Sequence, residues 1–438
     1  MWKQIFRQLW YYRRGSAWLF VELVIIIAAS WFIVDEIWTS SYRINNIPAG
    51  YDTEGVYCVY LKDLTPGAKG FSLSQAPLVN QKENLRRFGD ALRAMPEVLA
   101  AAPMSMGHPG MGVGVSSLLP LDSVNYLSMA IFERECGSED FDVFRYDLIY
   151  PENGKFEDVP GSILISEDLA EYLFPGQNPV GRTINDAMGG EAGTEGIRSG
   201  RIVGVVGDIK ASGYTDNIPY VITNEADIVG ETGGDRMYAF RLRPGVDGDK
   251  FLEKASMEWR KTMRFGNFRV QEVYSFKDRV DAKVRIDMQD KLFIWKIVWI
   301  FLIVNALLAV ASIGWLRMEE RRGEIGVRRA MGGSPVRILT HYMKEVWVIF
   351  AAAVVLGILI TVNIITISKI NIVSPSNSLD NVMPLNAADF PLLFDPVAHF
   401  LAVEGIVLCI LLLAVTAAIL IPAAGALRLP PVEALRDE

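Results

Sequence analysis

The sequence is poor in the residues and motifs from which most enzyme sites are built. Its 438 residues include only three histidines, His108, His341 and His399, and three cysteines. It contains no Gly-x-Ser-x-Gly, His-Glu-x-x-His, Walker A or EF-hand pattern. Asp208, at the end of a predicted strand, could serve as a catalytic acid, but an aspartate in that setting more often forms a turn. The sequence therefore favours a protein that is not an enzyme and binds no metal or cofactor of its own.

Positive charge is scarce over most of the chain. The formal net charge is −8, and residues 39–292 alone carry 28 Lys and Arg against 37 Asp and Glu, a net of −9. Such a surface is a poor match for the phosphate backbone of nucleic acid. Two cysteines in this segment, Cys58 and Cys136, either pair in an oxidising compartment or are small buried apolar residues, and the sequence leaves both readings open.

Long apolar runs are present, and they define the architecture. They cover residues 17–38, 293–314, 347–367 and 398–421. Each is close to the ~20 residues that a helix needs to cross the hydrocarbon. The first run follows a basic start but has no small-x-small cleavage site after it, which favours an uncleaved anchor over a signal peptide. We therefore predict four transmembrane helices.

The distribution of basic residues orients these helices. Positively charged segments stay on the cytoplasmic side, which places residues 1–16 and the basic segment 315–346 inside. Alternation across four helices then places the tail 422–438 inside as well, although its own charge favours neither side. Residues 39–292 and the loop 368–397 are then outside. The prediction is a multi-pass protein of the cytoplasmic membrane with one large extracytoplasmic domain between its first and second helices.

The extracytoplasmic segment shows the same strand-helix-strand pattern near its two ends. The first unit consists of strands over 55–61 and 97–102 with a helix over 80–95, and the second of strands over 236–242 and 267–273 with a helix over 249–263. We predict an α+β membrane protein whose outer α/β domain combines two β-α-β units with a subdomain inserted at roughly 110–215.

Within the insertion the pattern is less regular. Residues 141–150 favour a strand or an extended segment, and residues 201–208 favour a strand. Residues 163–174 favour a short strand that runs into a helix. The glycine-rich stretch 107–114 lacks the lysine of a phosphate-binding loop, which favours a flexible surface loop.

A stalk is predicted immediately before the second transmembrane helix. Apolar residues recur every four positions between 276 and 292, namely Phe276, Val280, Val284, Met288 and Leu292. Four residues turn a helix by about 400°, so this stripe winds slowly around the axis, as in a helix that packs obliquely. An ordinary amphipathic surface helix is the alternative.

Three charged residues fall inside or at the ends of the apolar runs, namely Glu22, Lys296 and Glu404. Such residues can form a proton relay, but each lies within about two turns of a predicted helix end, where a long side chain reaches the interface. The interfacial reading is favoured.

The basic segment between the second and third helices has the pattern of a helical elbow. Gly332 and Gly333 supply a helix stop, and Ser334 followed by Pro335 forms an N-cap and first-turn pair. Its arginines could serve only to fix topology. The interleaved glycines instead suggest close approach to a partner surface.

This segment resembles a known family. Glu320-Arg-Arg-Gly-Glu-Ile-Gly-Val-Arg-Arg-Ala-Met-Gly-Gly-Ser334, between the second and third of four helices, is similar to the motif of FtsX-like permeases of the MacB type. Residues 163–174, 178–184 and 201–209 resemble the extracytoplasmic core of that family, and Pro430-Pro-Val-Glu-Ala-Leu-Arg436 resembles its tail. The FtsX-like permease domain would cover residues 293–431.

The resemblance implies a function and partners. Permeases of this type are transmembrane subunits of ABC transporters and work by mechanotransmission: a separate cytoplasmic ATPase binds ATP, and the motion passes to the outer domain. The docking surface for the ATPase would contain Arg321, Arg322, Glu324, Arg328, Arg329, Met331 and Gly332. A second permease copy or a paralogue, membrane lipid, and in some relatives a periplasmic adaptor and outer-membrane duct are further partners.

Two other readings stay open at this stage. A membrane-anchored sensor or scaffold would bind an outer ligand and signal through the elbow without ATP, and a tethered hydrolase would use Asp208. The substrate of a permease could be a peptide, a drug or a lipoprotein.

Overall fold

The structure of the protein is a computed structural model. In it the chain forms two units. It describes residues 11, 13–105, 108–111, 115–120, 126–152, 154–187, 200–210, 212–213, 219–228, 236–331, 334–368 and 390–428. The side chains of residues 13–14, 115–120, 126–128, 187, 322, 324, 328–329, 335, 421 and 423–428 lie outside this description. One unit contains residues 1–41, 290–375 and 390–438, and the other contains residues 42–289 and 376–389. They are called the membrane unit and the outer unit below.

The membrane unit consists of long helices. They are α2 (Arg13–Asn46), α9 (Asp290–Glu320), α10 (Arg322–Ala330), α11 (Pro335–Ser368), the short α12 (Pro391–Phe394) and α13 (Pro396–Arg428). Four helical stretches are long and apolar enough to cross a membrane, namely Gly15–Asn46, Phe276–Glu320, Val336–Ser368 and Pro396–Leu420. The helices α2, α9, α11 and α13 contain all four predicted runs and extend beyond them. For example, α2 extends beyond the predicted run and ends at Asn46, because Pro48 disfavours helical geometry at Ile47.

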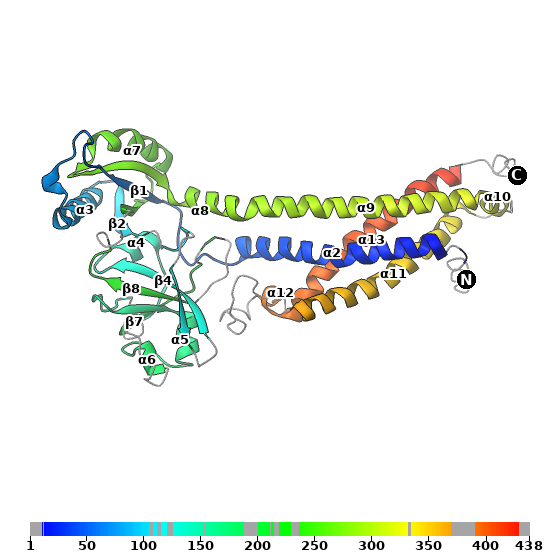
Figure 1. The fold of residues 1–438 in the computed structure, drawn as a ribbon, viewed down its shortest axis with the longest axis horizontal. Helices are drawn as coiled ribbons and strands as arrows, with labels where there is room; N and C mark the ends of the chain where they lie inside the picture. The colour runs from blue at the N-terminus through cyan, green and yellow to red at the C-terminus, as the bar shows by residue number, and fades with distance from the viewer. Residues whose placement is uncertain are drawn as a thin grey trace. The chain divides into compact units, whose positions relative to one another are not determined.

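A single stripe on each helix forms the core of the membrane unit. Residues four apart on α13 are fully buried, namely Val403, Val407, Leu411 and Val415, and α13 packs along α9 (Figure 1). Gly314 on α9 permits this packing, because a Cβ atom there would lie 3.2 Å from the ring of Pro422. Many of the other apolar side chains of α9 are exposed within the unit, including Phe293, Ile297 and Phe301, as expected for residues that face lipid.

The outer unit contains a five-stranded sheet in which the two predicted β-α-β units interlock. Its order is β10-β11-β1-β9-β2, and β1 pairs antiparallel with both β9 and β11. The strands are β1 (Val56–Asp63), β2 (Val98–Met104), β9 (Arg236–Leu242), β10 (Arg264–Phe265) and β11 (Phe268–Ser275). The strands of one unit thus alternate with those of the other, which is the split β-α-β arrangement.

Alternation along the strands gives this sheet two buried faces. On β1, Val59 and Leu61 pack with α3 (Leu78–Arg93) and α7 (Gly248–Thr262), which both lie on that face. Val56 and Cys58 point to the other face and share a core with the second sheet. The first sheet is therefore held between two helices and the inserted subdomain.

The second sheet has six strands in the order β3-β4-β8-β6-β7-β5. They are β3 (Val115–Pro120), β4 (Tyr126–Glu135), β5 (Leu148–Tyr150), β6 (Ile163–Ser166), β7 (Ile202–Val206) and β8 (Tyr220–Glu225), accompanied by α5 (Glu167–Leu173) and α6 (Ile184–Ala187). Strand β8 lies inside this sheet, between β4 and β6. The inserted subdomain therefore reaches beyond residue 215, its predicted end.

Two local predictions in this subdomain are wrong. Residues 141–150 do not form one strand, because Asp140–Phe144 is a helical turn, α4, which buries Val143 and Phe144, and Asp140 and Asp142 suit its N-terminal end. Only Leu148–Tyr150 is a strand. The glycine-rich stretch is not a surface loop where it is described, since His108, Pro109 and Gly110 are buried. Cys58 and Cys136 are both free thiols.

Candidate functional site

The coupling segment, residues 315–346, is helical through most of its described length. The amide of Arg321 donates to the carbonyl of Arg317 over 3.2 Å, and the amide of Ile325 donates to the carbonyl of Arg321 over 2.9 Å. Hydrogen bonding of the helical i to i−4 type therefore continues from α9 into α10, with Arg321 as the one residue between them. α9 and α10 therefore form a nearly continuous helix.

The predicted start of the next helix is confirmed. Helix α11 begins at Pro335, and the amide of Arg337 donates to the hydroxyl of Ser334 over 3.3 Å, which is an N-cap hydrogen bond. Proline suits the first helical position because its missing amide has no partner there. Gly332 and Gly333, the predicted stop between α10 and α11, lie outside the described residues.

Glu345 on α11 is the centre of a buried charged cluster. Its side chain is 1% exposed. Oε1 lies 2.9 Å from Nη1 of Arg321 and 3.7 Å from Nε2 of His341, and Oε2 lies 3.8 Å from Nη1 of Arg317. The guanidinium of Arg321 also lies over the ring of Tyr342, 5.4 Å from its centroid. The cluster joins the end of α9 to the first turns of α11.

Arg317 extends the cluster to the first transmembrane helix. Its Nη2 donates to the hydroxyl of Ser16 on α2 over 2.6 Å. A buried ion pair is weak evidence for net stability, but loss of one partner is strongly unfavourable because it leaves a buried charge uncompensated. Three helices, α2, α9 and α11, are therefore held in one arrangement by charge and hydrogen bonding.

The structure separates the predicted docking residues into different environments. Arg321 is 4% exposed and pairs with Glu345, so its guanidinium is an internal contact of the segment and not part of an open surface. Met331 is 77% exposed, as a docking residue should be. The side chains of Arg322, Glu324, Arg328 and Arg329, and the whole of Gly332, lie outside the described part of the chain.

Exposed apolar residues in the segment were not predicted as docking residues. Val327, one turn before Met331 on α10, is 45% exposed, and Val336 in the first turn of α11 is 67% exposed. Val327 and Met331 share one side of the helix because they are four positions apart.

The central role of Glu345 was also missed by the sequence analysis. The signal for it is weak: Arg317 and Arg321 are four apart on one helical face, and Glu345 stands immediately before the third apolar run. Sequence spacing alone does not place an acid 24 positions away opposite Arg321.

The predicted stalk residues lie on three successive helical pieces. Phe276, Val280 and Val284 are buried on α8 (Phe276–Val284), and Met288 is half-buried in a π-helical turn, Arg285–Gln289. Leu292 is buried and belongs to the membrane unit. The helix that carries the stripe is therefore not one regular α-helix, because a π turn with wider hydrogen-bond spacing separates α8 from α9.

The three intramembrane charges are found in different environments. Glu22 is half-buried and Lys296 is exposed within the membrane unit. Glu404 is buried on α13, and no hydrogen bond to its carboxylate is found among the described residues. This burial differs from the predicted side chain that reaches the interface. Among those residues there is also no group of three His, Cys, Asp or Glu side chains that could hold a metal ion.

The sequence is similar to one family model and to two curated proteins. A model of the FtsX-like permease C-terminal family matches residues 296–424. The macrolide export ATP-binding/permease protein MacB of Aggregatibacter actinomycetemcomitans is 26% identical over 202 residues, and that of Mannheimia succiniciproducens is 24% identical over 277 residues. These alignments cover 45% and 63% of this chain, and the chain spans 29% and 38% of the relatives' length.

Solved extracytoplasmic domains are also similar. The periplasmic region of MacB from Actinobacillus actinomycetemcomitans is 12% identical, with a TM-score of 0.28, over 55% of this chain and 97% of that one. The extracellular domain of the ABC-type transporter YknZ from Gram-positive bacteria is 13% identical, with a TM-score of 0.28, over 49% of this chain and 100% of that one. The C-terminal part of the chain, residues 296–424, thus matches the FtsX-like permease family, and the chain is similar to MacB permeases over a longer stretch.

Proposed function

We propose that this protein is the permease subunit of an ABC transporter that works by mechanotransmission. It is a multi-pass protein of the inner membrane with an extracytoplasmic domain. The observation that carries the proposal is the helical path through the chain. α10 follows α9 with one intervening residue, and Phe276–Glu320 is a single helical stretch of 45 residues that begins in the outer unit.

The two ends of this stretch are suited to receive and deliver motion. At the inner end, the Glu345 cluster fixes α9 to α11, and Val327 and Met331 offer an exposed apolar face on α10. At the outer end, Phe276 and Val280 are part of the core shared by the two sheets. Because close-packed cores transmit displacement, movement of α8 would be passed to the inserted subdomain.

The ATPase is expected on a separate subunit that binds the coupling segment. The curated relatives are named ATP-binding/permease proteins, whereas the amino-acid sequence of this protein contains no Walker A pattern. The chain itself then performs no catalysis and uses no cofactor, and it acts as a dimer with itself or with a paralogue. The substrate is a peptide, drug or lipoprotein that is exported or extracted on the outer side of the membrane. A periplasmic adaptor and an outer-membrane duct are further partners of the transporter.

Co-purification with a candidate ATPase tests this proposal. The double variant Arg328→Glu with Arg329→Glu, which reverses two charges on α10, should abolish recovery of the ATPase. Arg201→Glu with Arg260→Glu, which reverses two charges in the outer unit, is the matched control and should leave recovery unchanged. A sensor or scaffold that signals without ATP would show no ATPase in either preparation, and that result would contradict the proposal.

A further inference from the structure

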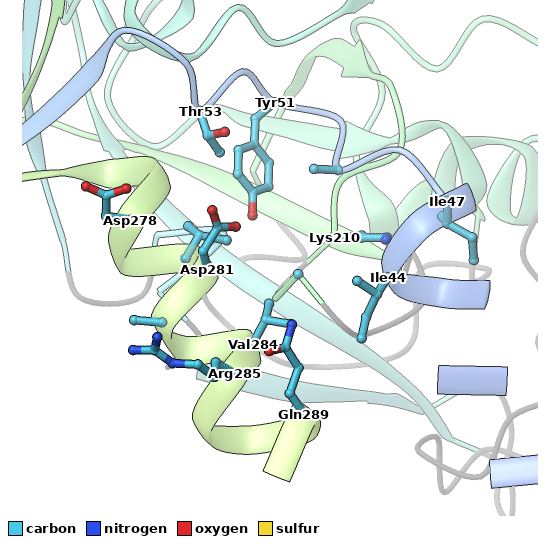
Figure 2. Close-up of a pocket in the computed structure, with 14 residues that line it drawn as sticks. Ile44, Ile47, Tyr51, Thr53, Lys210, Asp278, Asp281, Val284, Arg285 and Gln289 are labelled. Atoms are coloured by element: carbon cyan, nitrogen blue, oxygen red, sulfur yellow. The ribbon is translucent and has the colours of Figure 1, made fainter. Parts of the chain in front are cut away.

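The outer unit contains a cavity next to the ends of two membrane helices. Its volume is about 690 Å³, within the range of small-molecule sites of about 300–1,000 Å³. One wall is formed by the last turn of α2 and the chain that follows it, another by α8 and the π turn, and the floor by the loop after β7. Figure 2 shows these three segments around the cavity. All of them belong to the outer unit.

The walls are partly apolar. Ile44 and Ile47 come from the end of α2, and Val280 and Val284 come from α8. Ile47, Val280 and Val284 are buried, so their side chains already form a dry surface. Gly213 allows Val284 to approach the loop, since a Cβ atom there would lie 2.6 Å from a Val284 methyl group. An apolar ligand group fits this side of the cavity.

A buried hydroxyl in the cavity wall lacks a hydrogen bond. Tyr51 is 8% exposed, and its hydroxyl has no hydrogen-bond partner among the described residues. In Figure 2 the hydroxyl end of Tyr51 points toward the Asp281 side of the cavity. Burial raises the pKa of this phenol, so the group is a proton donor at neutral pH. Buried polar groups are rarely left unbonded, which points to an acceptor supplied by a ligand.

Unpaired charges of both signs line the same cavity. Asp278 and Asp281 on α8 and Arg285 in the π turn form no ion pair with any residue that the structure describes. The two lysines on this helix do pair, Lys277 with Glu54 and Lys283 with Asp287. The ammonium of Lys210 is already engaged, donating to the carbonyl of Arg43 over 2.5 Å at the end of α2.

From these four features we propose that the cavity binds the zwitterionic headgroup of a phosphatidylethanolamine-type lipid, with the upper part of an acyl chain against Ile44, Ile47, Val280 and Val284. The phosphate accepts from the Tyr51 hydroxyl and pairs with Arg285, and the lipid ammonium pairs with Asp281 and Asp278. A lipid is the occupant because Ile44 lies in the last turn of the first membrane-spanning helix and Gln289 lies in the helical stretch that contains the second apolar run, so two walls of the cavity continue along the chain into the bilayer.

Bound lipid would join segments that are separate along the chain. It would touch the end of α2, the chain around Tyr51 and α8 at once, so its occupancy would resist separation of α8 from α2. The lipid site would thus be a regulatory contact of the helix that carries motion. It does not depend on the ATPase, and its test can fail while ATPase co-purification succeeds.

Native mass spectrometry of the full chain from nanodiscs tests the site. Wild-type protein in equimolar phosphatidylethanolamine, phosphatidylcholine and phosphatidylglycerol should retain phosphatidylethanolamine preferentially. Asp281→Asn, Arg285→Gln and the isosteric Tyr51→Phe should each lower this retention about tenfold. Asp249→Asn and Arg260→Gln, charge removals on exposed positions of α7, should leave it unchanged. Gel filtration and circular dichroism should be the same for all variants.

Three results would overturn the proposal. One is equal retention of phosphatidylethanolamine by wild type and all three cavity variants. Another is equal retention of phosphatidylglycerol, which lacks the ammonium group, by the wild type. The third is displacement of bound phosphatidylethanolamine by soluble phosphoethanolamine or inorganic phosphate at concentrations no higher than those at which a short-chain phosphatidylethanolamine displaces it. The acyl chain would then contribute nothing to binding.

Discussion

Oε1 of Glu345 lies 2.9 Å from Nη1 of Arg321, with both side chains buried among the helices of the membrane unit. The two residues are 24 positions apart, on α11 and at the junction of α9 with α10. Glu345 also lies near Arg317 and His341, so one carboxylate balances several nitrogen groups. The coupling segment is therefore organised around a single acidic side chain.

Glu345→Gln should destabilise the membrane unit strongly. The substitution keeps the shape of the side chain but removes the buried carboxylate that pairs with Arg321 and lies near Arg317, and breaking a buried pair costs about 3–5 kcal/mol. Thermal unfolding in detergent would report it as a lower Tm. Glu319→Gln, an exposed acid at the end of α9, is the control and should change the Tm little. An unchanged Tm for Glu345→Gln would show that the cluster is not buried as described.

Arg134→Met should destabilise the outer unit. Arg134 is buried on β4, where it donates to Asp140 over 2.8 Å, to Asp158 over 2.8 Å and to Asn224 over 2.9 Å. Methionine would leave Asp140 buried without its partner, at a cost of about 3–5 kcal/mol. Susceptibility of the outer unit to limited proteolysis would measure the loss.

The control for Arg134 is an exposed pair in the same unit. Arg201 and Glu157 lie 3.3 Å apart with both side chains 62% exposed. Arg201→Met should change stability by about 0.5 kcal/mol or less, because exposed pairs are screened by solvent. Equal proteolysis of the two variants would contradict the distinction between buried and exposed pairs.

Acidification should weaken the outer unit through His108. Burial lowers the pKa of this imidazole to about 4, although the Pro109 carbonyl, 2.8 Å from Nδ1, acts in the opposite direction. The hydroxyl of Tyr146 lies 2.6 Å from Nε2. The unfolded chain takes up a proton near pH 6.5 and the folded chain only near pH 4. Stability contributed by neutral His108 is therefore present above about pH 6.5 and lost as the pH falls toward 4, by about 3 kcal/mol in all.

Unfolding of the wild type and of His108→Phe between pH 7 and pH 4 would check this sign. Phenylalanine suits the surrounding rings of Phe144 and Phe276 but cannot take up a proton. The variant should lose less stability than the wild type over this range. Parallel pH profiles would show that His108 is not the group responsible.

Gly357→Val should disturb the packing of α11 on α2. A Cβ atom at Gly357 would lie 2.8 Å from a methyl group and 3.1 Å from the Cβ of Ile27, which is too close for either helix to remain in place. Overpacking of this kind costs about 1–3 kcal/mol. Gly405→Ala on α13 is the control, because nothing lies within 4 Å of its Cβ position, and it should be neutral or slightly stabilising in thermal unfolding.

Elements defined by local pattern were predicted well. The strand over 236–242 was predicted with the bounds of β9, since its buried apolar residues and the Pro244-Gly245 turn are both local signals. The four membrane helices were likewise found from apolar runs, and the Ser334 cap from its side-chain chemistry. These features depend on residues within a few positions of one another.

Features that depend on distant pairing were not predicted. The insertion of β9 between β1 and β2, and the place of β8 in the second sheet, follow from tertiary packing that no local pattern encodes. The burial of Arg321 has the same cause: on sequence alone it is one of several arginines in a basic loop, and only Glu345 distinguishes it. The cavity of the outer unit that Tyr51 lines combines residues from three separate segments, none of which carries a motif.

The most direct test of the account is whether ATP changes the outer unit through α10. The permease should be reconstituted in nanodiscs with its ATPase, and hydrogen–deuterium exchange of residues 42–289 measured with and without ATP. Wild type and Met257→Asp, an exposed control on α7, should show ATP-dependent protection around α8 and the second sheet. Val327→Asp with Met331→Asp should abolish it while the fold is retained. ATP-dependent protection that survives in this double variant would contradict coupling through α10.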